Sequence, residues 1–465
     1  MATSTQSTAF DWPLFSLYLA LLAIGWGMLY SVGYGEGYDL SLSDFLLQTQ
    51  VGKQTIWIGV SLVGLFFIYL IDATFWRTFA YPIFGVTLIL LIGVLLFGNE
   101  IKGATSWFRV AGFTLQPSEL AKFGAALAVA GFLSQYSTDM RTLRDQAVAF
   151  GMLLVPMGLI LLQPDAGSAL VFLAFLVPFY REGFPAGFFV VGFLIAGLLI
   201  LGFRFEPLYV IGAMSLAGLY LLARHLPHTR YWMLGLTVLA AAGIYLAPAA
   251  LPWVTATGVV LFLGLASYHF FGRQARLATL LGSGFLVGAL LVFAASWSFD
   301  NLLKSHQQDR INVWLNPAKC DPQGSLYNLL QSKMAIGSGR LMGKGFLAGN
   351  LTKGNYVPEQ STDFIFCTVG EEHGFVGSLS IIALFLLLLF RITQLAERQR
   401  TPFARSFAYG VAGIFFIHFV INIGMTMGLM PIIGIPLPFI SKGGSAMLGF
   451  TLLVGVLLKL DGEGR

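Results

Sequence analysis

Long apolar runs separated by short polar segments fill almost the whole of this chain. About 20 consecutive apolar residues in a helix cross the hydrocarbon core of a bilayer, and many of the runs approach that length. The pattern predicts about 14 membrane helices, of which 168–181 is short and, because it contains Pro178, is expected to be tilted or kinked. The predicted helices cover 13–32, 54–71, 78–97, 117–135, 147–163, 168–181, 186–203, 207–223, 231–249, 253–271, 277–298, 375–391, 406–424 and 445–460.

Composition agrees with a membrane protein and excludes a soluble one of this size. Of the 465 residues, 57% are hydrophobic and only 11% are charged. Soluble domains carry about a quarter charged residues. No segment is long and polar enough to fold as a separate soluble domain. We therefore predict an all-α, polytopic transmembrane helix bundle that forms a single membrane domain over residues 1–465.

The charged residues predict how the chain is oriented. Arginines gather in the loops on one side of the predicted helices, and the positive-inside rule places that side in the cytoplasm. Both termini are then cytoplasmic, while the acidic stretch 36–44 and the long polar loop 300–374 face outward. The net charge of +5 fits basic cytoplasmic loops, so no nucleic-acid partner is predicted.

The outer loop 300–374 contains the first candidate site. Ionised side chains are costly near lipid, so Asp363, a carboxylate at the mouth of a helix, is a functional candidate. Asp363 could instead be the N-cap of the following helix, and the residues leave both roles open. The glycine-rich run 337–345 could place backbone N–H groups around an anion such as a phosphate. The loop also supplies candidate cations and supporting acids, namely Arg310, Lys333, Lys344, Glu359 and Glu371.

A second outer loop, 98–119, combines cations with an aromatic ring. Lys102 and Arg109 are its only cations, and Trp107 lies between them. A ring beside cations suits a sugar-phosphate ligand, because sugar faces stack on aromatic rings. The alternative is a tryptophan of the aromatic belt at the membrane interface.

The next predicted helix carries a charged pair near its start. Glu119 and Lys122 are three residues apart and share a helix face, so they can pair inside the bundle. A charged pair within a membrane span is expensive, which favours a functional or fold-specifying role over a decorative one.

Two further segments are candidates for supporting the site. Asp165 lies between two predicted spans, where capping or support is favoured over catalysis. Residues 430–445 contain three prolines and several glycines, which break any helix there. Irregular backbone at membrane depth is tolerated where it lines a cavity, so Ser441 and Lys442 become candidate binding residues. The six histidines are scattered, and no metal site is predicted.

These segments resemble the SEDS family of shape, elongation, division and sporulation proteins. Within that family, Ala335–Gly339 together with Gly343–Gly345 is more similar to the RodA branch than to the FtsW branch. The matching segments are Lys102–Arg109, Gln116–Lys122, Gln163–Ser168, Gln331–Gly345, Pro358–Gly374 and Asn422–Ser445.

The resemblance implies a multi-pass protein of the bacterial cytoplasmic membrane that polymerises lipid II into peptidoglycan glycan strands during cell elongation. It implies that the aspartate matching Asp363 is catalytic, and that Trp107, Glu119 and Lys122 match functionally important positions. It also implies a class B penicillin-binding protein, the transpeptidase of the pair, as partner, within a complex of other elongation proteins in the membrane.

Two features depart from the family pattern. The family usually has about ten spans, so about four helices within 187–297 are expected to be inserted. An even number of added helices leaves the downstream loop on the same side of the membrane. Lys442 stands where the family often has tyrosine.

The resulting hypothesis makes Asp363 the general base of an inverting glycosyl transfer. Arg109, Lys122, Lys333 and Lys344 are candidates to neutralise a diphosphate leaving group, and a divalent cation that bridges Asp363 and the diphosphate is an alternative. Two other functions remain open. A flippase for lipid-linked precursors would also combine polar residues with broken helices, and a non-enzymatic cell-wall scaffold would tolerate substitution of Asp363 and Trp107.

Overall fold

The structure is a computed structural model that describes residues 10–34, 41–101, 103–110, 113–223, 231, 235, 248–272, 274–303, 305–324 and 326–464. The chain forms two compact units, 1–185 with 321–465, and 186–320. Among the described residues, ten helices are long and apolar enough to cross a membrane. The fold is therefore that of a mostly helical, multi-pass membrane protein.

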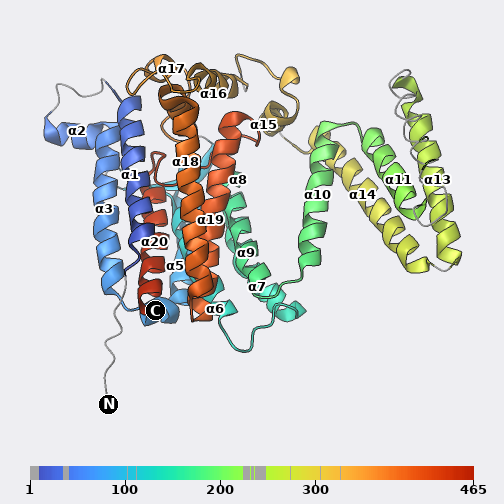
Figure 1. Ribbon diagram of the computed structural model, residues 1–465, viewed down its shortest axis with the longest axis horizontal. Helices are drawn as coiled ribbons and strands as arrows, with labels where there is room; N and C mark the ends of the chain where they lie inside the picture. The colour runs from blue at the N-terminus through green and yellow to red at the C-terminus, as the bar shows by residue number, and fades with distance from the viewer. Residues whose placement is uncertain are drawn as a thin grey trace. The chain divides into compact units, whose positions relative to one another are not determined.

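The first unit contains eight long helices, which Figure 1 labels. They are α1 (Trp12–Val32), α3 (Gln50–Leu70), α5 (Ala80–Phe97), α6 (Pro117–Leu133), α7 (Leu143–Leu161), α18 (Ile365–Arg398), α19 (Pro402–Met427) and α20 (Gly444–Gly464). Its shorter helices are α2 (Leu42–Gln48), α4 (Ala73–Thr78), α8 (Ala166–Val171), η1 (Phe172–Phe175), α9 (Leu176–Arg181), α16 (Tyr327–Ser338) and α17 (Asn350–Lys353). The helices α2, α16 and α17 lie at one end of this unit, and the C-terminus lies at the other (Figure 1).

Helix α19 forms the core of the first unit. It packs against α6, α18 and α20. Of the residues in its apolar stretch, 83% are buried, compared with 22% in the apolar stretch of α5. Small residues allow this close packing, as they do in many membrane bundles. A side chain at Gly413, for example, would place its Cβ 2.6 Å from the carbonyl oxygen of Ala174. The helix at the centre can therefore hold polar side chains away from lipid.

Two predicted elements differ from the structure. The predicted helix 168–181 is divided into α8, a 3₁₀ turn and α9. The segment between α5 and α6 is not a loop but an antiparallel three-stranded sheet of β1 (Asn99–Ile101), β2 (Ala104–Val110) and β3 (Phe113–Leu115). The predicted helical bundle is confirmed as a mostly helical fold, and this sheet was missed because β1 and β3, with three residues each, carry too few alternating positions to be recognised.

Helix α18 is broken near its start. Gly374 has φ 63° and ψ −156°, a conformation that favours glycine. The loop after α16 enters the break. The N–H groups of Phe375 and Val376 donate to the carbonyls of Arg340 and Leu341, at 2.8 and 3.1 Å. In return, the N–H groups of Lys344 and Gly345 donate to the carbonyls of Glu371 and Glu372, at 3.0 and 2.9 Å. The backbone groups freed by the kink are thus paired with this loop.

The second unit contains the helices α10 (Ala186–Arg204), α11 (Pro207–Ala223), α13 (Leu251–Phe271), α14 (Ala275–Asn301) and α15 (Ser305–Leu315), with 3₁₀ turns at Pro248–Ala250 and Pro317–Lys319. A buried cluster that includes Leu222, Phe262 and Phe285 holds α11, α13 and α14 together. The helices predicted to be inserted within 187–297 belong to this unit. Most of the predicted helix 231–249 lies outside the described residues.

Ion pairs cluster at the end of the first unit where the C-terminus lies. Asp11, the N-cap of α1, accepts hydrogen bonds at 2.7 Å from the guanidinium groups of both Arg391 and Arg398. Arg398 also pairs with Asp461 of α20 at 2.6 Å. Burial alone would raise the pKa of Asp11, but hydrogen bonds from Arg391, the Leu14 N–H and Arg398 outweigh it and lower that pKa to about 2.

We predict that Asp11→Asn removes an acid-dependent part of the stability. A carboxylate with a depressed pKa stabilises the fold fully above its unfolded pKa of about 3.9 and loses that stabilisation as the pH falls through its folded value. The shift corresponds to about 2 kcal/mol at neutral pH. Detergent unfolding midpoints should therefore differ at pH 7 and converge towards pH 2.

The control for this prediction is Asp72→Asn at the start of α4, where the side chain makes no capping hydrogen bond. Its unfolding midpoints should follow those of the wild type at every pH. A constant offset between the Asp11→Asn variant and the wild type, unchanged from pH 7 to pH 2, would contradict the assignment.

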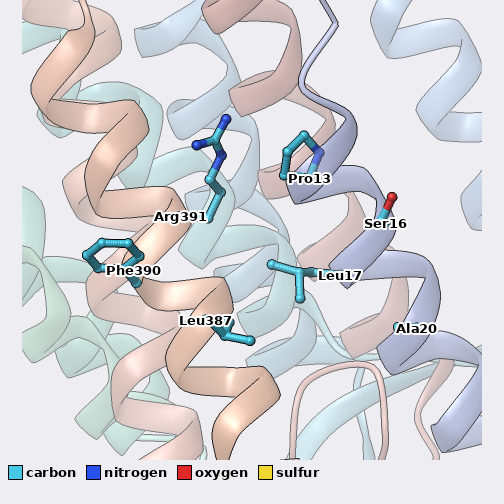
Figure 2. Close-up of a pocket in the computed structure, with 7 residues that line it drawn as sticks. All are labelled: Pro13, Ser16, Leu17, Ala20, Leu387, Phe390 and Arg391. Carbon is cyan, nitrogen blue, oxygen red and sulfur yellow. The ribbon is translucent and has the colours of Figure 1, made fainter.

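A groove of about 470 Å³ opens between α1 and α18 near the same end (Figure 2). It is lined by Pro13, Ser16, Leu17, Ala20, Leu387, Phe390 and Arg391. Its wall is almost entirely apolar, and none of the predicted site residues lines it. The candidate site lies at the opposite end of α18, where that helix begins.

Candidate functional site

Asp363 lies in a tight turn that leads into α18. Glu359 begins the turn with φ 60°, and its carbonyl accepts hydrogen bonds from the N–H groups of Thr362 and Phe364 at 3.1 and 3.2 Å. The Thr362 hydroxyl donates to the Glu359 carboxylate at 3.0 Å. Phe364, the residue after Asp363, is the N-cap residue of α18 and makes no side-chain capping hydrogen bond.

The broken segment 430–443, which precedes α20, packs against this turn. Ser441 donates its hydroxyl to the Thr362 carbonyl at 2.6 Å and accepts the Leu437 N–H at 2.8 Å. The N–H of Lys442 donates to the Ser361 carbonyl at 2.8 Å. Gly434 has φ 75°, and a Cβ there would lie 3.3 Å from the Asp363 carboxylate. The segment thus forms a wall beside the half-buried Asp363 side chain.

Helix α19 contributes two buried polar side chains that the sequence reasoning did not single out as site residues. The Asn422 amide donates to the Asp363 carbonyl at 2.9 Å and to the Ile435 carbonyl at 2.7 Å. His418 lies one turn earlier, and its Nδ1 is 2.9 Å from the Pro436 carbonyl oxygen. Polar residues four positions apart in an apolar span share one helix face, and that spacing was the signal available in the sequence.

The predicted pair of Glu119 and Lys122 is confirmed. Their charged groups are 2.7 Å apart, and both side chains are buried. Lys122 Nζ is also 2.9 Å from His418 Nε2 and lies 5.4 Å from the centroid of the Phe450 ring. The ammonium group is thereby engaged inside the bundle.

Asp165 has a supporting position. Its carboxylate accepts the Ser168 N–H at 3.0 Å and so caps α8. It also accepts the Gln116 amide at 2.9 Å. The Gln116 N–H donates to the Ser445 hydroxyl at 2.9 Å, which links the start of α6 to the start of α20.

The glycine-rich run 337–345 serves the kink of α18, because its N–H groups at Lys344 and Gly345 are used by helix carbonyls. Lys344 also pairs with the buried Glu371 at 2.7 Å. That carboxylate further accepts the N–H groups of Leu351 and Thr352 and the Thr352 hydroxyl. The neighbouring carboxylate, Glu372, accepts the hydroxyl of Ser31 from α1. This run thus helps to hold the fold together, and the N–H groups of Lys344 and Gly345 are not free to bind an anion.

The other candidates lie on several elements. Lys333 is exposed on α16 beside Gly428. Trp107 and Arg109 are on β2, with Trp107 opposite Asn99 and Arg109 opposite Thr114. The Lys442 ammonium donates to the Gln50 side chain at 3.2 Å.

Two further predicted cations, Arg310 and Lys102, are not among the described residues of the first unit. Arg310 belongs to α15 of the second unit and is exposed there. Lys102 lies outside the described residues. Within the described part of the chain, no three histidine, cysteine, aspartate or glutamate side chains are grouped so that they could hold a metal ion.

Known proteins resemble this chain over nearly its whole length. It is 34% identical over 454 residues to the peptidoglycan glycosyltransferase RodA of Treponema pallidum, covering 97% of each chain. It is 27% identical over 450 residues to the peptidoglycan glycosyltransferase MrdB of Escherichia coli, covering 97% of this chain and 93% of the relative.

The fold also resembles that of a solved structure. This is a chain of a peptidoglycan synthase complex described for its structural coordination of polymerization and crosslinking, with a TM-score of 0.62 at 24% identity, covering 98% of this chain and 99% of that one. The family of cell cycle proteins named FtsW/RodA/SpoVE matches residues 12–215 and 224–465. The predicted resemblance is confirmed, and this chain belongs to the FtsW/RodA/SpoVE family.

Proposed function

We propose that this protein is a peptidoglycan glycosyltransferase that polymerises lipid II into β-1,4-linked glycan strands. The observation that carries the proposal is the arrangement around Asp363. Asn422 holds its carbonyl, the 359–364 turn sets its backbone, and Gly434 leaves space beside its carboxylate. A carboxylate supported by three separate elements at the mouth of a membrane bundle suits proton transfer to or from a bound ligand.

In the proposed reaction, Asp363 acts as the general base. The acceptor presents the 4-hydroxyl of its GlcNAc, and Asp363 takes that proton as the oxygen attacks the anomeric carbon of the donor MurNAc. The bond from that carbon to undecaprenyl diphosphate breaks, and the configuration inverts from α to β. One carboxylate suffices, because diphosphate leaves without protonation when its charge is stabilised. General-base catalysis contributes about 10²–10⁴-fold.

Among the cations, Arg109 and Lys333 suit direct contact with the diphosphate best, because both side chains are exposed. Lys122 and Lys344 already pair with buried glutamates, so we assign them supporting roles. We retain Lys102, Ser441, Lys442 and the Trp107 ring as proposed substrate contacts, with Asp165, Glu359 and Glu371 as support. Loss of activity on chelation would favour a divalent cation held with the help of Asp363, which would supply charge stabilisation for the diphosphate.

The membrane arrangement is proposed from charge. The Asp363 end would face outward, and the arginine-rich end with both termini would face the cytoplasm. About 14 spans, four of them inserted within 187–297, would form one membrane domain with the catalytic loop 300–374 outside. A class B penicillin-binding protein would supply crosslinking, which agrees with the complex described for the solved relative.

The test is polymerisation of labelled lipid II by the purified protein, alone and with its penicillin-binding partner carrying an inactivated transpeptidase site. We expect glycan chains to form both with the protein alone and with the partner present. Movement of lipid II across liposome membranes without any new glycosidic bond would instead establish a flippase.

We predict that Gly434→Ala reduces polymerisation at least about tenfold, because small displacements of reacting groups cost rate steeply. The added methyl would lie 3.3 Å from the Asp363 carboxylate, and φ 75° strains any L-residue. Gly443→Ala is the matched control, since its Cβ would meet only Ala446, at 3.5 Å. Equal polymerisation rates in Gly434→Ala and Gly443→Ala would contradict the role proposed for the space between Gly434 and the Asp363 carboxylate.

A further inference from the structure

A chain of buried polar groups leads from α6 through α19 to the wall beside Asp363. The Glu119 carboxylate contacts Lys122 Nζ at 2.7 Å. That nitrogen lies 2.9 Å from His418 Nε2, and His418 Nδ1 lies 2.9 Å from the Pro436 carbonyl oxygen. The exposed fractions are 3% for Glu119, 1% for Lys122 and 1% for His418. No substrate can reach these groups directly without displacing the core.

The chemistry of the partners fixes the tautomer of His418. A carbonyl oxygen only accepts, so Nδ1 must carry the hydrogen that is donated to Pro436. A protonated lysine only donates, so Nε2 must be the acceptor from Lys122. His418 is therefore a neutral connector that accepts on one side and donates on the other. A leucine of similar bulk would do neither, whereas a glutamine offers both an acceptor and a donor.

His418 and Asn422 together hold two consecutive residues of the wall. Asn422, one turn further along α19, binds the carbonyl of Ile435, and His418 binds that of Pro436. Gly434, which lies beside the Asp363 carboxylate, directly precedes them. No helix fixes the backbone here, since α19 ends at Met427 and α20 begins only at Gly444. The carbonyls of Ile435 and Pro436 are therefore held by these two side chains, while Ser441 and Lys442 attach the end of the segment to the 359–364 turn.

We propose that His418 is a positioning residue that connects the buried Glu119–Lys122 pair to the wall beside Asp363. In this role the pair does not bind the substrate. It fixes His418, and His418 fixes Pro436 and with it the space around the carboxylate. The effect on catalysis rests on the proposed function, whereas the effect on the wall can be measured without it.

The first experiment compares hydrogen exchange in residues 431–442 of the full-length protein in nanodiscs, for His418→Leu, His418→Gln and the wild type. Exchange should accelerate in His418→Leu and stay near the wild type in His418→Gln. His269→Leu is the matched control, because His269 is a buried histidine of α13 in the second unit. Unchanged exchange in folded His418→Leu, or equal acceleration in both His418 variants, would overturn the proposal.

The second experiment measures lipid II polymerisation by the same proteins with the penicillin-binding partner. His418→Leu should lower kcat by about 100-fold, the cost of a displacement near 1 Å, with KM nearly unchanged. His418→Gln should recover most of that loss. A loss of the same size in His269→Leu, or a loss in His418→Leu confined to KM, would refute a positioning role.

The Lys122→Met variant breaks the same connection while leaving His418 itself in place. Adding His418→Leu to it should have little further effect on kcat, because both changes break one connection. If the double variant instead lost kcat by the product of the two single losses, Lys122 and His418 would not act through one connection. If the wild type forms no glycan while the exchange results hold, the proposed function fails and the positioning of the wall stands.

Discussion

Replacing Asp363 with asparagine should reduce lipid II polymerisation by about 10²–10⁴-fold while the protein still folds and still binds its partner. Asparagine keeps the shape of the side chain but cannot take the proton of the attacking hydroxyl. The backbone contact with Asn422 uses the Asp363 carbonyl and is unaffected by the change. The measurement is glycan formation by purified variant and wild type at equal concentrations.

The matched control is Asp145→Asn at the start of α7, where the carboxylate accepts the Asp139 N–H at 2.8 Å and an amide oxygen can do the same. That variant should polymerise normally. Full activity of Asp363→Asn would remove Asp363 as the base and with it the mechanism proposed above. A variant that no longer copurifies with the partner would point to a binding role for Asp363 instead.

Replacing Glu371 with alanine should have the largest effect on stability. Its side chain is fully buried and accepts Lys344, two backbone N–H groups and the Thr352 hydroxyl. Removing it leaves those donors without an acceptor, which costs about 3–5 kcal/mol. The unfolding midpoint in detergent should fall markedly, and proteolysis should first cut the segment around α17, because that helix loses its anchor.

Glu397→Ala is the comparison, because Glu397 is half exposed and its carboxylate accepts hydrogen bonds from two side chains, those of Arg181, at the surface, and Tyr409. Surface ion pairs contribute little, so its midpoint should stay near that of the wild type. If Glu371→Ala unfolds at the same midpoint as Glu397→Ala, the buried network does not hold α17 and the loop before it as described.

The membrane helices could be predicted because apolar runs of sufficient length have few alternatives. The start of α18 was missed, since Glu371, Glu372 and His373 read as a polar loop. The helix begins at Ile365, well before the predicted 375. Glu371 and Glu372 are buried because the 340–345 loop and α1 supply partners for them, and such partners lie far away in the sequence.

The site was predictable only in part. Asp363 and the Glu119–Lys122 pair carry charge in apolar surroundings, which is a strong signal. His418 and Asn422 carry none, and, apart from the contact of His418 with Lys122, their partners are backbone carbonyls that no residue type reveals. The ion pair between Lys344 and Glu371 could not be predicted either, because the two residues are far apart in the sequence and meet only through the kink at Gly374.

The reciprocal backbone hydrogen bonds at that kink limit where segments of this protein can be exchanged with those of its relatives in chimeras. The loop that follows α16 shares a backbone ladder with α18, across residues 340–345 and 371–376. A chimera that swaps the loop alone, with its junction before Ile365, would join two halves of that ladder from different proteins. Junctions placed beyond Val376 would carry the ladder intact, and libraries built with those boundaries should yield far more folded hybrids.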